Sequence, residues 1–395
     1  MISGFWEKIG FWSNKLVKLW KEKSNWVWFH AVSVGEINAA WPLILELHKR
    51  KPSYPLMIST TTTLGYKHLR ELTKDKDFLI FYFPFDLPWT IKSLLNSVKI
   101  KILIIAETEI WPNLLSECKK KNIPVLLINA RLSDKSFKNY KFFKFYFKNV
   151  VNNFTEVLSQ SENDSNKFKE LGVEKSKLKT LGNIKFSSNT STEQSNSNEN
   201  GNEKTNEIKI IFASTHRDEE DIAVSIYKKL LENHKNIRLI IAPRHINRTD
   251  EISKITSQNN FTPVLRTENK EIKSNDEILI FNTIGELTKY YKSSQITVLG
   301  GTFVKVGGHN VIEPIREGSY TIIGPYSFKI QELTTLFKNE DAIVQASNIS
   351  ELEYKLSEAI SNKELREIKV RNGKRIIKRN QNVLQETAER IISYL

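Results

Sequence analysis

Short apolar runs recur along the chain, and each is followed by a longer segment in which apolar and polar residues mix. From Trp26 onward this pattern predicts alternating strands and helices. Because most of the predicted strands are apolar along their whole length, they indicate a parallel sheet covered by helices on both faces. In the first half the predicted strands are Trp26–Val34, Pro55–Thr61, Phe78–Phe83, Val98–Ala106 and Pro124–Asn129, and the predicted helices are Ile37–Lys49, Tyr66–Leu72 and Pro112–Lys121.

The composition changes between residues 187 and 207, where the sequence reads SSNTSTEQSNSNENGNEKTNE and lacks any large apolar residue. Such a segment is predicted to be a polar, low-complexity linker. The alternation then restarts, and residues after Ser350 are predicted to be mostly helical. The predicted strands of this second half are Ile208–Ala213, Ile237–Ala242, Glu277–Phe281, Gln295–Leu299 and Tyr320–Ile323.

The chain is therefore predicted to fold as two Rossmann-like α/β domains. The N-terminal domain covers residues 1–186 and the C-terminal domain residues 208–395, whose last helices could pack back on the N-terminal domain. Ligands of open α/β sheets bind beyond the carboxyl ends of the strands. We therefore expect the two parallel sheets to face a central cleft.

Length, charge and cysteine content narrow the class of protein. The chain has 395 residues, more than one ordinary hydrophobic core accommodates. Its single cysteine, Cys118, excludes an internal disulfide and a cysteine-rich zinc site and fits a reducing compartment. No apolar run is long enough to span a membrane as a helix. The formal net charge of +14 favours anionic partners such as nucleic acid, anionic lipid or phosphorylated substrates.

Two segments combine aromatic residues with lysines. Residues 1–26 place four tryptophans among lysines, and residues 137–147 read FKNYKFFKFYF. Aromatic and basic residues together suit a membrane interface. The same pattern also suits helices that pack on their own domain. Residues 137–147 are predicted to form one helix with an apolar face and a lysine face.

A glycine-rich segment from Leu299 to Pro314, LGGTFVKVGGHNVIEP, joins a predicted strand to a helix expected to begin at Asn310. Glycines allow a backbone to approach a ligand closely, and a helix N-terminus offers unpaired N–H groups to an anion. Asn310 and Glu313 also have the spacing of a capping pair. The segment is interpreted either as an anion-binding loop or as a simple helix cap.

Polar and charged residues follow one predicted strand after another. Glu36 follows the first strand and is interpreted either as a general base for a hydroxyl or as an acid stabilised at a helix N-terminus. Glu107 and Glu109 close the fourth strand, where burying a charge costs several kcal/mol unless it is paired. Further groups at such strand ends are Asn129–Arg131, Gly182–Lys185, Ser214–His216, Pro243–His245 and Ile284–Leu287.

Several stretches of the chain resemble the 3-deoxy-D-manno-octulosonic acid (Kdo) transferases. They run in order from about residue 26 to about residue 330 and read HAVSVGEINAA, PFDLP, ETEIWPN, NARLS, GNIKF, STHRDEE, APRH, GEL, GGTFVKVGGHNVIEP and GPYSF. The resemblance implies the two-domain GT-B glycosyltransferase fold. It also implies CMP-Kdo as the donor and a lipid A precursor as the acceptor, in the synthesis of the inner core of lipopolysaccharide.

The resemblance implies roles for individual residues. Glu36 matches the catalytic base of the family, and Glu107 and Lys185 match positions that stabilise the transition state. No Asp-x-Asp pair is placed to hold a divalent ion, which fits a reaction without a metal or other cofactor. Attack on Kdo from the face opposite CMP is expected to invert the configuration. The positions that match contacts to CMP are Pro243, Arg244, Ile284, Gly285, Glu286, Asn310, Val311, Ile312 and Glu313.

The resemblance also implies a place in the cell, at the cytoplasmic face of the bacterial inner membrane, as a peripheral protein without a nucleic-acid partner. The chain begins near the point where the hydrophobic N-terminal anchor of the family ends, so membrane attachment is expected from residues 1–26, residues 137–147 or the acceptor. Two alternatives remain: a GT-B enzyme that uses a different nucleotide sugar, and a non-catalytic basic binding protein on the same fold.

Overall fold

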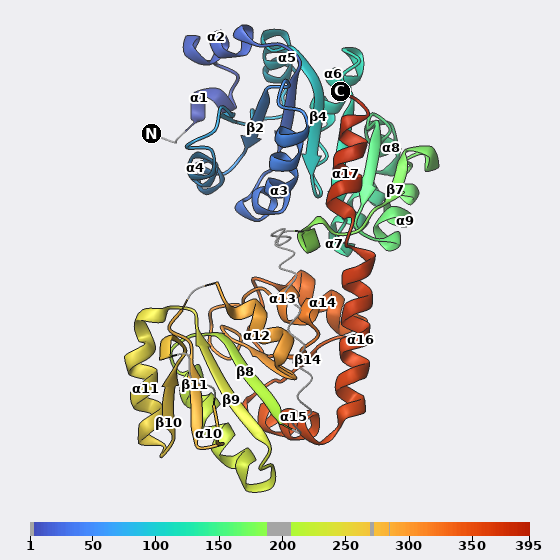
Figure 1. Cartoon of the computed structure of the whole chain (residues 1–395). Coiled ribbons are helices and arrows are strands. Elements are labelled where there is room, and N and C mark those ends of the chain that lie inside the picture. The colour runs from blue at the N-terminus through green and yellow to red at the C-terminus, as the bar shows by residue number, and fades with distance from the viewer. Residues whose placement is uncertain (1–3, 188–206, 269–271, 284) are drawn as a thin grey trace. The chain divides into compact units, whose positions relative to one another are not determined.

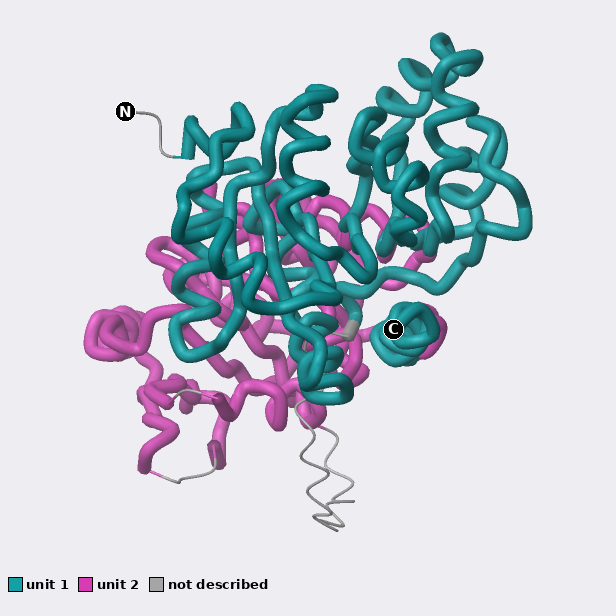
Figure 2. Tube along the Cα trace, turned by 90° about the horizontal axis from the view of Figure 1, so that it is seen from above, with its two compact units in different colours: residues 1–192, 380–395 teal, residues 193–379 magenta. Residues whose placement is uncertain are grey.

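The computed structural model describes residues 4–187, 207–268, 272–283 and 285–395. Nearly all of the predicted linker, residues 188–206, lies outside the described residues, and so does Ile284. The chain forms two compact units (Figure 2). Unit 1 comprises residues 1–192 and 380–395, and unit 2 comprises residues 193–379.

Unit 1 contains one seven-stranded parallel sheet. Its strands are β1 (Trp26–His30), β2 (Leu56–Thr60), β3 (Leu79–Tyr82), β4 (Ile100–Ala106), β5 (Val125–Ala130), β6 (Glu156–Ser159) and β7 (Leu178–Thr180). Its helices are α1 (Phe5–Lys8), α2 (Asn14–Glu22), α3 (Val34–Arg50), α4 (Thr63–Leu72), α5 (Pro88–Ser97), α6 (Pro112–Lys120), α7 (Asp134–Phe142), α8 (Lys144–Val151), α9 (Glu162–Leu171) and α17 (Val383–Ile392), with the short turns η1 (Lys175–Lys177) and η2 (Ile184–Ser187).

Unit 2 contains a second seven-stranded parallel sheet. Its strands are β8 (Ile208–Thr215), β9 (Ile237–Pro243), β10 (Thr262–Leu265), β11 (Glu277–Ile280), β12 (Ile296–Leu299), β13 (Tyr320–Ile323) and β14 (Val344–Gln345). Its helices are α10 (Glu219–Asn233), α11 (Thr249–Gln258), α12 (Leu287–Ser293), α13 (Ile312–Glu317), α14 (Gln331–Asn339), α15 (Ile349–Ser361) and α16 (Lys363–Arg379), with the turns η3 (Ile246–Arg248) and η4 (Arg266–Glu268).

The strand order creates one switch point in each sheet. Unit 1 has the order β3-β2-β1-β4-β5-β6-β7, so the chain starts at β1, builds one side and then crosses to β4. Unit 2 has the order β10-β11-β9-β8-β12-β13-β14, in which β8 and β12 are the corresponding neighbours. Open α/β sheets bind ligands beyond the carboxyl ends of such a strand pair.

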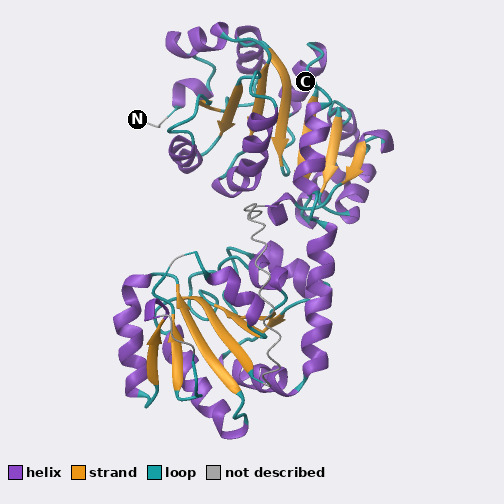
Figure 3. Ribbon diagram, in the orientation of Figure 1, coloured by secondary structure: helices purple, strands orange, loops and turns teal. Residues whose placement is uncertain are grey.

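Helices cover both faces of each sheet, as the apolar strands predict (Figure 3). In unit 1, α3, α4 and α17 pack on one face, and α2, α5, α6, α8 and α9 pack on the other. In unit 2, α10, α11 and α15 pack on one face and α12 on the other. None of the helices in the described ranges is long and apolar enough to cross a membrane.

The predicted parallel α/β architecture is confirmed, and the errors are local. Residue Val34 begins α3 and does not belong to β1, because the extended Ser33 caps the helix there. The aromatic segment 137–147 forms two helices that are separated at Phe143, where one helix was predicted. The short strands β6, β7, β10 and β14 were not predicted, since runs of two to four residues carry little periodic signal.

The C-terminal helix α17 belongs to unit 1 (Figure 1), where it contacts α3. Its apolar side chains, including the fully buried Ile391, complete the core on that face of the sheet. Arg390 adds a bidentate ion pair: its Nη2 lies 2.8 Å from Glu156 Oε1 and its Nε lies 3.2 Å from Glu156 Oε2. Residues at the end of the chain are therefore structural parts of the N-terminal unit.

This packing predicts a large cost for Ile391→Ala. The cavity left beside α3 should lower the free energy of unfolding of unit 1 by about 2 to 5 kcal/mol, measured by urea denaturation. Gln385→Ala, at an exposed position of the same helix, is the control and should change it by less than about 0.5 kcal/mol. Equal stabilities of the two variants would contradict the docking of α17 on unit 1.

Candidate active site

Glu36 lies in the first turn of α3, directly after the central strand β1. Its Oε2 accepts the N–H of Val32 at 2.7 Å, and its Oε1 accepts the hydroxyl of Ser33 at 3.0 Å. Ser33 Oγ in turn accepts the N–H of Glu36 at 3.3 Å. This arrangement is close to a capping box. The helix cap therefore orients the carboxylate that a general base requires, and the two interpretations of Glu36 are compatible.

Glu107 follows β4, the strand next to β1. Its backbone has a φ of 61°, in the left-handed region that a non-glycine residue seldom adopts. The residue is only 8% exposed. Its Oε1 lies 3.1 Å from Lys185 Nζ and its Oε2 lies 3.4 Å from Arg131 Nε. Pairing of both oxygens offsets the desolvation cost of the buried carboxylate, and it brings the predicted residues Glu107 and Lys185 together.

Asparagine side chains hold the turn that carries Lys185. The N–H of Lys185 donates to Asn183 Oδ1 at 3.0 Å, and the N–H of Ile184 donates to Asn129 Oδ1 at 3.0 Å. Asn129 has a φ of 51°, a conformation that asparagine tolerates better than most residues. The N–H of Asn183 donates to Asn380 Oδ1 at 2.7 Å. The NARLS and GNIKF stretches therefore supply asparagines that fix the backbone as well as the charged side chains that pair with Glu107.

Three carboxyl groups influence one another at this switch point. Burial raises the pKa of Glu36, and the charge of Glu107 adds to the rise, while the N–H of Val32 and the charge of Lys185 oppose it. Burial, and then the charges of Glu36 and Glu107, raise the pKa of Glu109 to about 7. Carboxyl groups whose pKa values lie near neutrality are typical of proton-transfer sites. Glu109 and Arg131 were noted at strand ends but were not among the predicted site residues.

In unit 2, the carboxylate of Glu219 joins two loops at the switch point. Glu219 begins α10, is 2% exposed and accepts the N–H groups of His216 at 2.9 Å, Gly301 at 2.7 Å and Phe303 at 2.9 Å. Burial raises the pKa of Glu219, and the three N–H groups oppose the rise. The turn after β8 and the glycine-rich loop after β12 are thereby fixed against each other.

Close backbone packing requires glycine at position 300. A Cβ there would lie 2.4 Å from the carbonyl oxygen of Ser214, which is part of the backbone and cannot turn aside. Further along the loop, the N–H groups of Gly307 and Gly308 donate to Gly301 O at 2.9 and 2.8 Å. The segment from Gly300 to Gly308 therefore folds back on itself at the end of β12.

The capping interpretation of Asn310 and Glu313 was wrong in detail, because the N-cap of α13 is Val311, which makes no side-chain cap hydrogen bond, and the two side chains bond to each other instead. Asn310 Oδ1 accepts the N–H of Ile312 at 3.0 Å, and Asn310 Nδ2 donates to Glu313 Oε1 at 2.9 Å. The helix α13 begins at Ile312, two residues later than predicted. Val311 and Ile312 are buried. A ligand at this position would meet the polar side chains of Asn310 and Glu313, whose part in nucleotide binding stays a prediction.

Pro243 and Arg244 lie at the end of β9, the strand beside β8. Pro243 is buried, whereas Arg244 is exposed. The N–H of Arg244 donates to Thr215 O at 2.9 Å, which keeps its backbone against the end of β8. Arg244 therefore extends from the edge at which Glu219 fixes the two loops.

Glu286 precedes α12, and its Oε2 lies 3.1 Å from Arg266 Nε. Beside it, Gly285 has a φ of 89°, and a Cβ there would have no atom within 4 Å. Burial, and then the charge of Glu313, raise the pKa of Tyr291 in α12, and α12 contacts α13. The structure thus places the predicted Glu286 directly before α12 and the predicted Glu313 in the adjacent helix α13.

Four side chains near Arg244 were not among the predicted site residues: His216, His245, His309 and Lys329. Burial, and then the charges of these neighbours and of Arg244, lower the pKa of His309 to about 4. The sequence signal for His216 and His245 was their position after a strand. His309 lies inside the glycine-rich segment, and Lys329 carried no signal that sequence reasoning could use.

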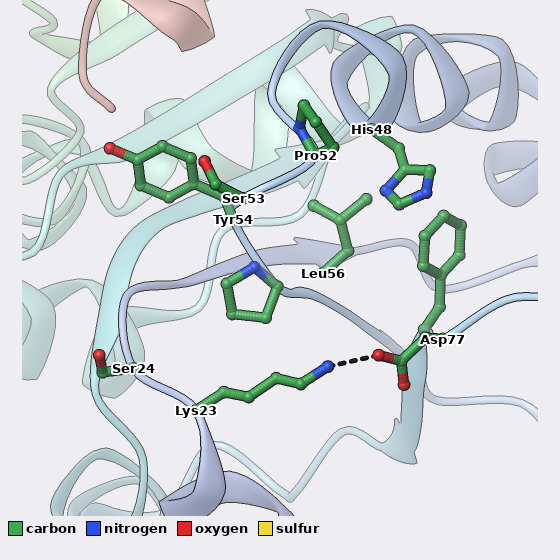
Figure 4. Close-up of a pocket in the computed structure, with 10 residues that line it drawn as sticks. Lys23, Ser24, His48, Pro52, Ser53, Tyr54, Leu56 and Asp77 are labelled. Carbon is green, nitrogen blue, oxygen red and sulfur yellow. Dashed lines mark hydrogen bonds and ion pairs between the residues drawn. The ribbon is translucent and has the colours of Figure 1, made fainter.

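A hollow in unit 1 lies at the opposite edge of the sheet, beside the amino ends of β1 to β3 (Figure 4). Its charged side chains, Lys23 and Asp77, pair with each other. His48 packs edge-on against Phe78, with ring centroids 4.9 Å apart. None of the predicted site residues within the described ranges lines this hollow. It is not part of the candidate active site.

Comparisons with known proteins identify the family that the chain resembles. Residues 3–188 match the family described as 3-deoxy-D-manno-octulosonic-acid transferase (kdotransferase). The 3-deoxy-D-manno-octulosonic acid transferase of Rickettsia felis is 31% identical over 372 residues, which cover 93% of this chain and 79% of that protein.

Two further similarities concern domain content and fold. A bifunctional glycosyltransferase/methyltransferase of Fusobacterium nucleatum is 32% identical over 86% of this chain, which spans about half (53%) of the length of that relative. Among solved structures, MurG of Acinetobacter baumannii matches 94% of this chain and 100% of its own, with a TM-score of 0.56 and 10% identity. The likeness to MurG concerns the GT-B fold alone.

The electrostatics of unit 1 predict a pH-dependent effect of Glu109→Gln. Because burial and two neighbouring carboxylates raise the pKa of Glu109 to about 7, wild-type protein loses stability as the pH rises from about 4.5 through 7. Glutamine removes this loss. We expect the variant to gain stability relative to wild type by on the order of 1 to 2 kcal/mol at pH 8 and little at pH 5.

Urea denaturation at both pH values measures this difference. Glu71→Gln, at an exposed position of α4 in the same unit, is the matched control and should show the same small effect at both pH values. A Glu109→Gln variant whose relative stability is independent of pH would show that Glu109 is ionised throughout this range.

Proposed function

The chain belongs to the 3-deoxy-D-manno-octulosonic acid (Kdo) transferase family of glycosyltransferases, and on this premise we propose that it transfers Kdo from CMP-Kdo to a lipid A precursor with inversion of configuration. The R. felis relative supports this activity by its name, which states the transferred sugar. The donor and the acceptor are those implied by the resemblance of the sequence motifs.

The arrangement of Glu36, Glu107 and Lys185 carries the proposal. Glu36 and Glu107 extend from the carboxyl ends of the neighbouring strands β1 and β4, where open α/β sheets bind ligands. Burial and a like charge raise the pKa of Glu36, which makes its carboxylate a stronger base than an exposed glutamate. Lys185 is held 3.1 Å from Glu107 and so supplies a fixed positive charge.

In the proposed reaction, Glu36 accepts the proton of a glucosamine hydroxyl of the acceptor. The hydroxyl oxygen attacks the anomeric carbon of Kdo from the face opposite CMP. As this bond forms, the bond between the anomeric carbon and the phosphate oxygen breaks, and CMP leaves with the electron pair. Lys185, oriented by Glu107, stabilises the charge that develops, an effect that preorganised charges produce without reorganisation.

We assign nucleotide binding to unit 2. Arg244 offers an exposed guanidinium to the phosphate of CMP. Glu286, Asn310 and Glu313 offer acceptors and donors to the ribose hydroxyls and the cytosine amino group. Pro243, Gly285, Val311 and Ile312, together with Ile284 outside the described residues, complete the set of positions that match the CMP contacts of the family.

The activity predicts that the lipid gains the mass of one or more Kdo units. Purified protein, CMP-Kdo made in situ and a tetra-acylated lipid A precursor should yield a lipid heavier by Kdo, as detected by mass spectrometry. CMP-sialic acid and UDP-sugars should not compete. Glu36→Gln keeps an oxygen that can accept the N–H of Val32, so its fold and CMP affinity should persist while the rate falls by about a hundredfold or more.

Glu46→Gln, in the same helix α3, is the control and should turn over at the wild-type rate. Turnover by Glu36→Gln at a comparable rate would remove the base assignment. Efficient use of another nucleotide sugar would instead show that CMP-Kdo is not the donor.

We also propose that unit 1 binds the inner-membrane surface through α7 and α8. The aromatic residues of these helices divide into two groups. Phe137, Tyr140 and Phe147 pack against the core, whereas a second group is exposed: Phe142 (83%), Phe143 (60%), Phe145 (94%) and Tyr146 (56%). Lysines lie among the exposed rings, and aromatic rings with lysines suit an anionic interface.

This surface predicts the effect of the triple variant Phe142→Ser, Phe143→Ser and Phe145→Ser. Loss of three rings should weaken binding to vesicles that contain anionic phospholipid by about tenfold or more, measured by co-sedimentation. Tyr354→Ser, which removes an exposed ring from α15 of unit 2, is the control and should bind as wild type does. Unchanged binding by the triple variant would assign membrane contact to another surface, such as residues 1–26.

A further inference from the structure

Three histidines gather at the carboxyl edge of the sheet of unit 2. His216 follows β8, His245 follows β9 and His309 lies in the loop after β12. The Nε2 atoms of His216 and His309 lie 2.7 Å apart, and the two rings are stacked with an interplanar angle of 4°. The ring of His245 stands edge-on to His216 at a centroid distance of 5.8 Å. The two imidazoles form a direct hydrogen bond, in which one Nε2 donates and the other accepts.

The fold builds this pair from segments that one carboxylate fixes together. Glu219 accepts the N–H groups of His216 and of Gly301, so the loops that carry the two histidines are joined. Gly301 leaves room for the imidazole, since a Cβ there would lie 3.2 Å from both Cδ2 and Nε2 of His309. The histidine pair is therefore preorganised.

Positive charge dominates the surroundings of the pair. Arg244 and Lys329 are exposed and, among the residues that the structure describes, their side chains have no ion-pair or hydrogen-bond partner. Two further cations near the histidines are already paired: Arg248 with Glu220 at 2.7 Å and with Glu251 at 3.2 Å, and Arg217 with Glu251 at 3.4 Å. Two cations beside the histidines thus lack a counter-charge.

The buried acids close to the pair are occupied by other partners. Glu219, three residues after His216, accepts three backbone N–H groups, and Glu220 pairs with Arg248. Asp218, the nearest acid along the chain from His216, is exposed. Burial, and then the neighbouring histidine and cations, lower the pKa of both His216 and His309, that of His309 to about 4. Without a ligand, both rings are therefore neutral at physiological pH.

The described residues contain no grouping of three or more His, Cys, Asp or Glu side chains suited to a metal ion. An anion, in contrast, matches both the unpaired cations and the position. β8 and β12 are the strand pair at the switch point of the sheet, where open α/β sheets bind their ligands. An anion there would reverse the effect of the cations and raise the affinity of the imidazoles for a proton.

We propose that His216 and His309, with Arg244 and Lys329, bind the phosphodiester of the nucleotide-sugar donor, and that the histidine pair takes up a proton when this anion binds. The inference rests on the proposed function and extends it to residues outside the motif-matched set. The hydrogen bond between the two Nε2 atoms keeps its single proton, so the added proton binds Nδ1 of the donating ring, and the pair then carries one positive charge toward the phosphate. Donor binding is consequently stronger at lower pH.

The methyl ester of CMP is a suitable probe, because its phosphodiester carries one negative charge that does not titrate near neutral pH. Calorimetry with the whole protein, in two buffers with different ionisation enthalpies, counts the protons taken up on binding. We expect an uptake that approaches one proton per ester at pH 6.5, and an affinity that falls by roughly tenfold between pH 6 and pH 8. Cytidine, which lacks the phosphate, should bind without proton uptake.

Variants identify the groups that take up the proton. In His309→Gln and in His216→Gln, an amide replaces the imidazole, so proton uptake should disappear and affinity for the ester should become independent of pH. His234→Gln is the matched control: His234 bonds to Ser357 Oγ at 3.0 Å and lies at the end of α10, and its removal should leave proton uptake unchanged.

The wild-type measurement alone can overturn the proposal. Binding of the ester without proton uptake, at an affinity equal at pH 6 and pH 8, removes the histidine pair from donor binding and leaves the proposed donor intact. Failure of wild-type protein to bind either cytidine or the ester overturns the proposed donor, and the histidine proposal with it. Proton uptake that persists in both glutamine variants assigns the proton to another group and also overturns the proposal.

Discussion

The parallel arrangement of the strands is the constraint on which the chemistry of this chain depends. Parallel neighbours are joined through helices that cross the sheet, so the carboxyl ends of all strands collect at one edge. In both units the chain begins at a central strand and builds the two sides in turn. In each unit, two neighbouring strands therefore carry their following loops to opposite sides: β1 and β4 in unit 1, and β8 and β12 in unit 2. Ligands of open α/β sheets bind at such a position.

The carboxylates at these edges have different roles because their surroundings differ. Glu219 accepts three backbone N–H groups and holds two loops together. Glu107 is buried between Lys185 and Arg131, which it orients. Glu36 is held by a helix cap, and its pKa is raised, as is that of Glu109. A carboxyl group that hydrogen-bond donors or cations surround therefore supports the structure. A carboxyl group that is buried near a like charge is a candidate base.

The two units differ in the sign of their excess charge at the switch point. Unit 1 gathers three glutamates around two cations, which suits removal of a proton from a neutral hydroxyl. Unit 2 gathers Arg244 and Lys329 around neutral histidines, which suits an anionic leaving group. This division agrees with the proposed roles of acceptor activation and nucleotide binding. It arises from a few residues at strand ends and not from the overall charge of +14, since the lysines that produce this charge are scattered along the chain.

The sequence by itself determined the alternation of strands and helices and the two α/β halves, because apolar runs and helical spacing are local patterns. It also identified Glu36 and Glu107 as strand-end acids. Only the tertiary structure decided the partners of these groups. Arg131 meets Glu107 because β5 lies beside β4, and His216 meets His309, which is 93 residues away, because β8 lies beside β12. Local pattern cannot specify which strands become neighbours, since strand order follows from the packing of the whole sheet.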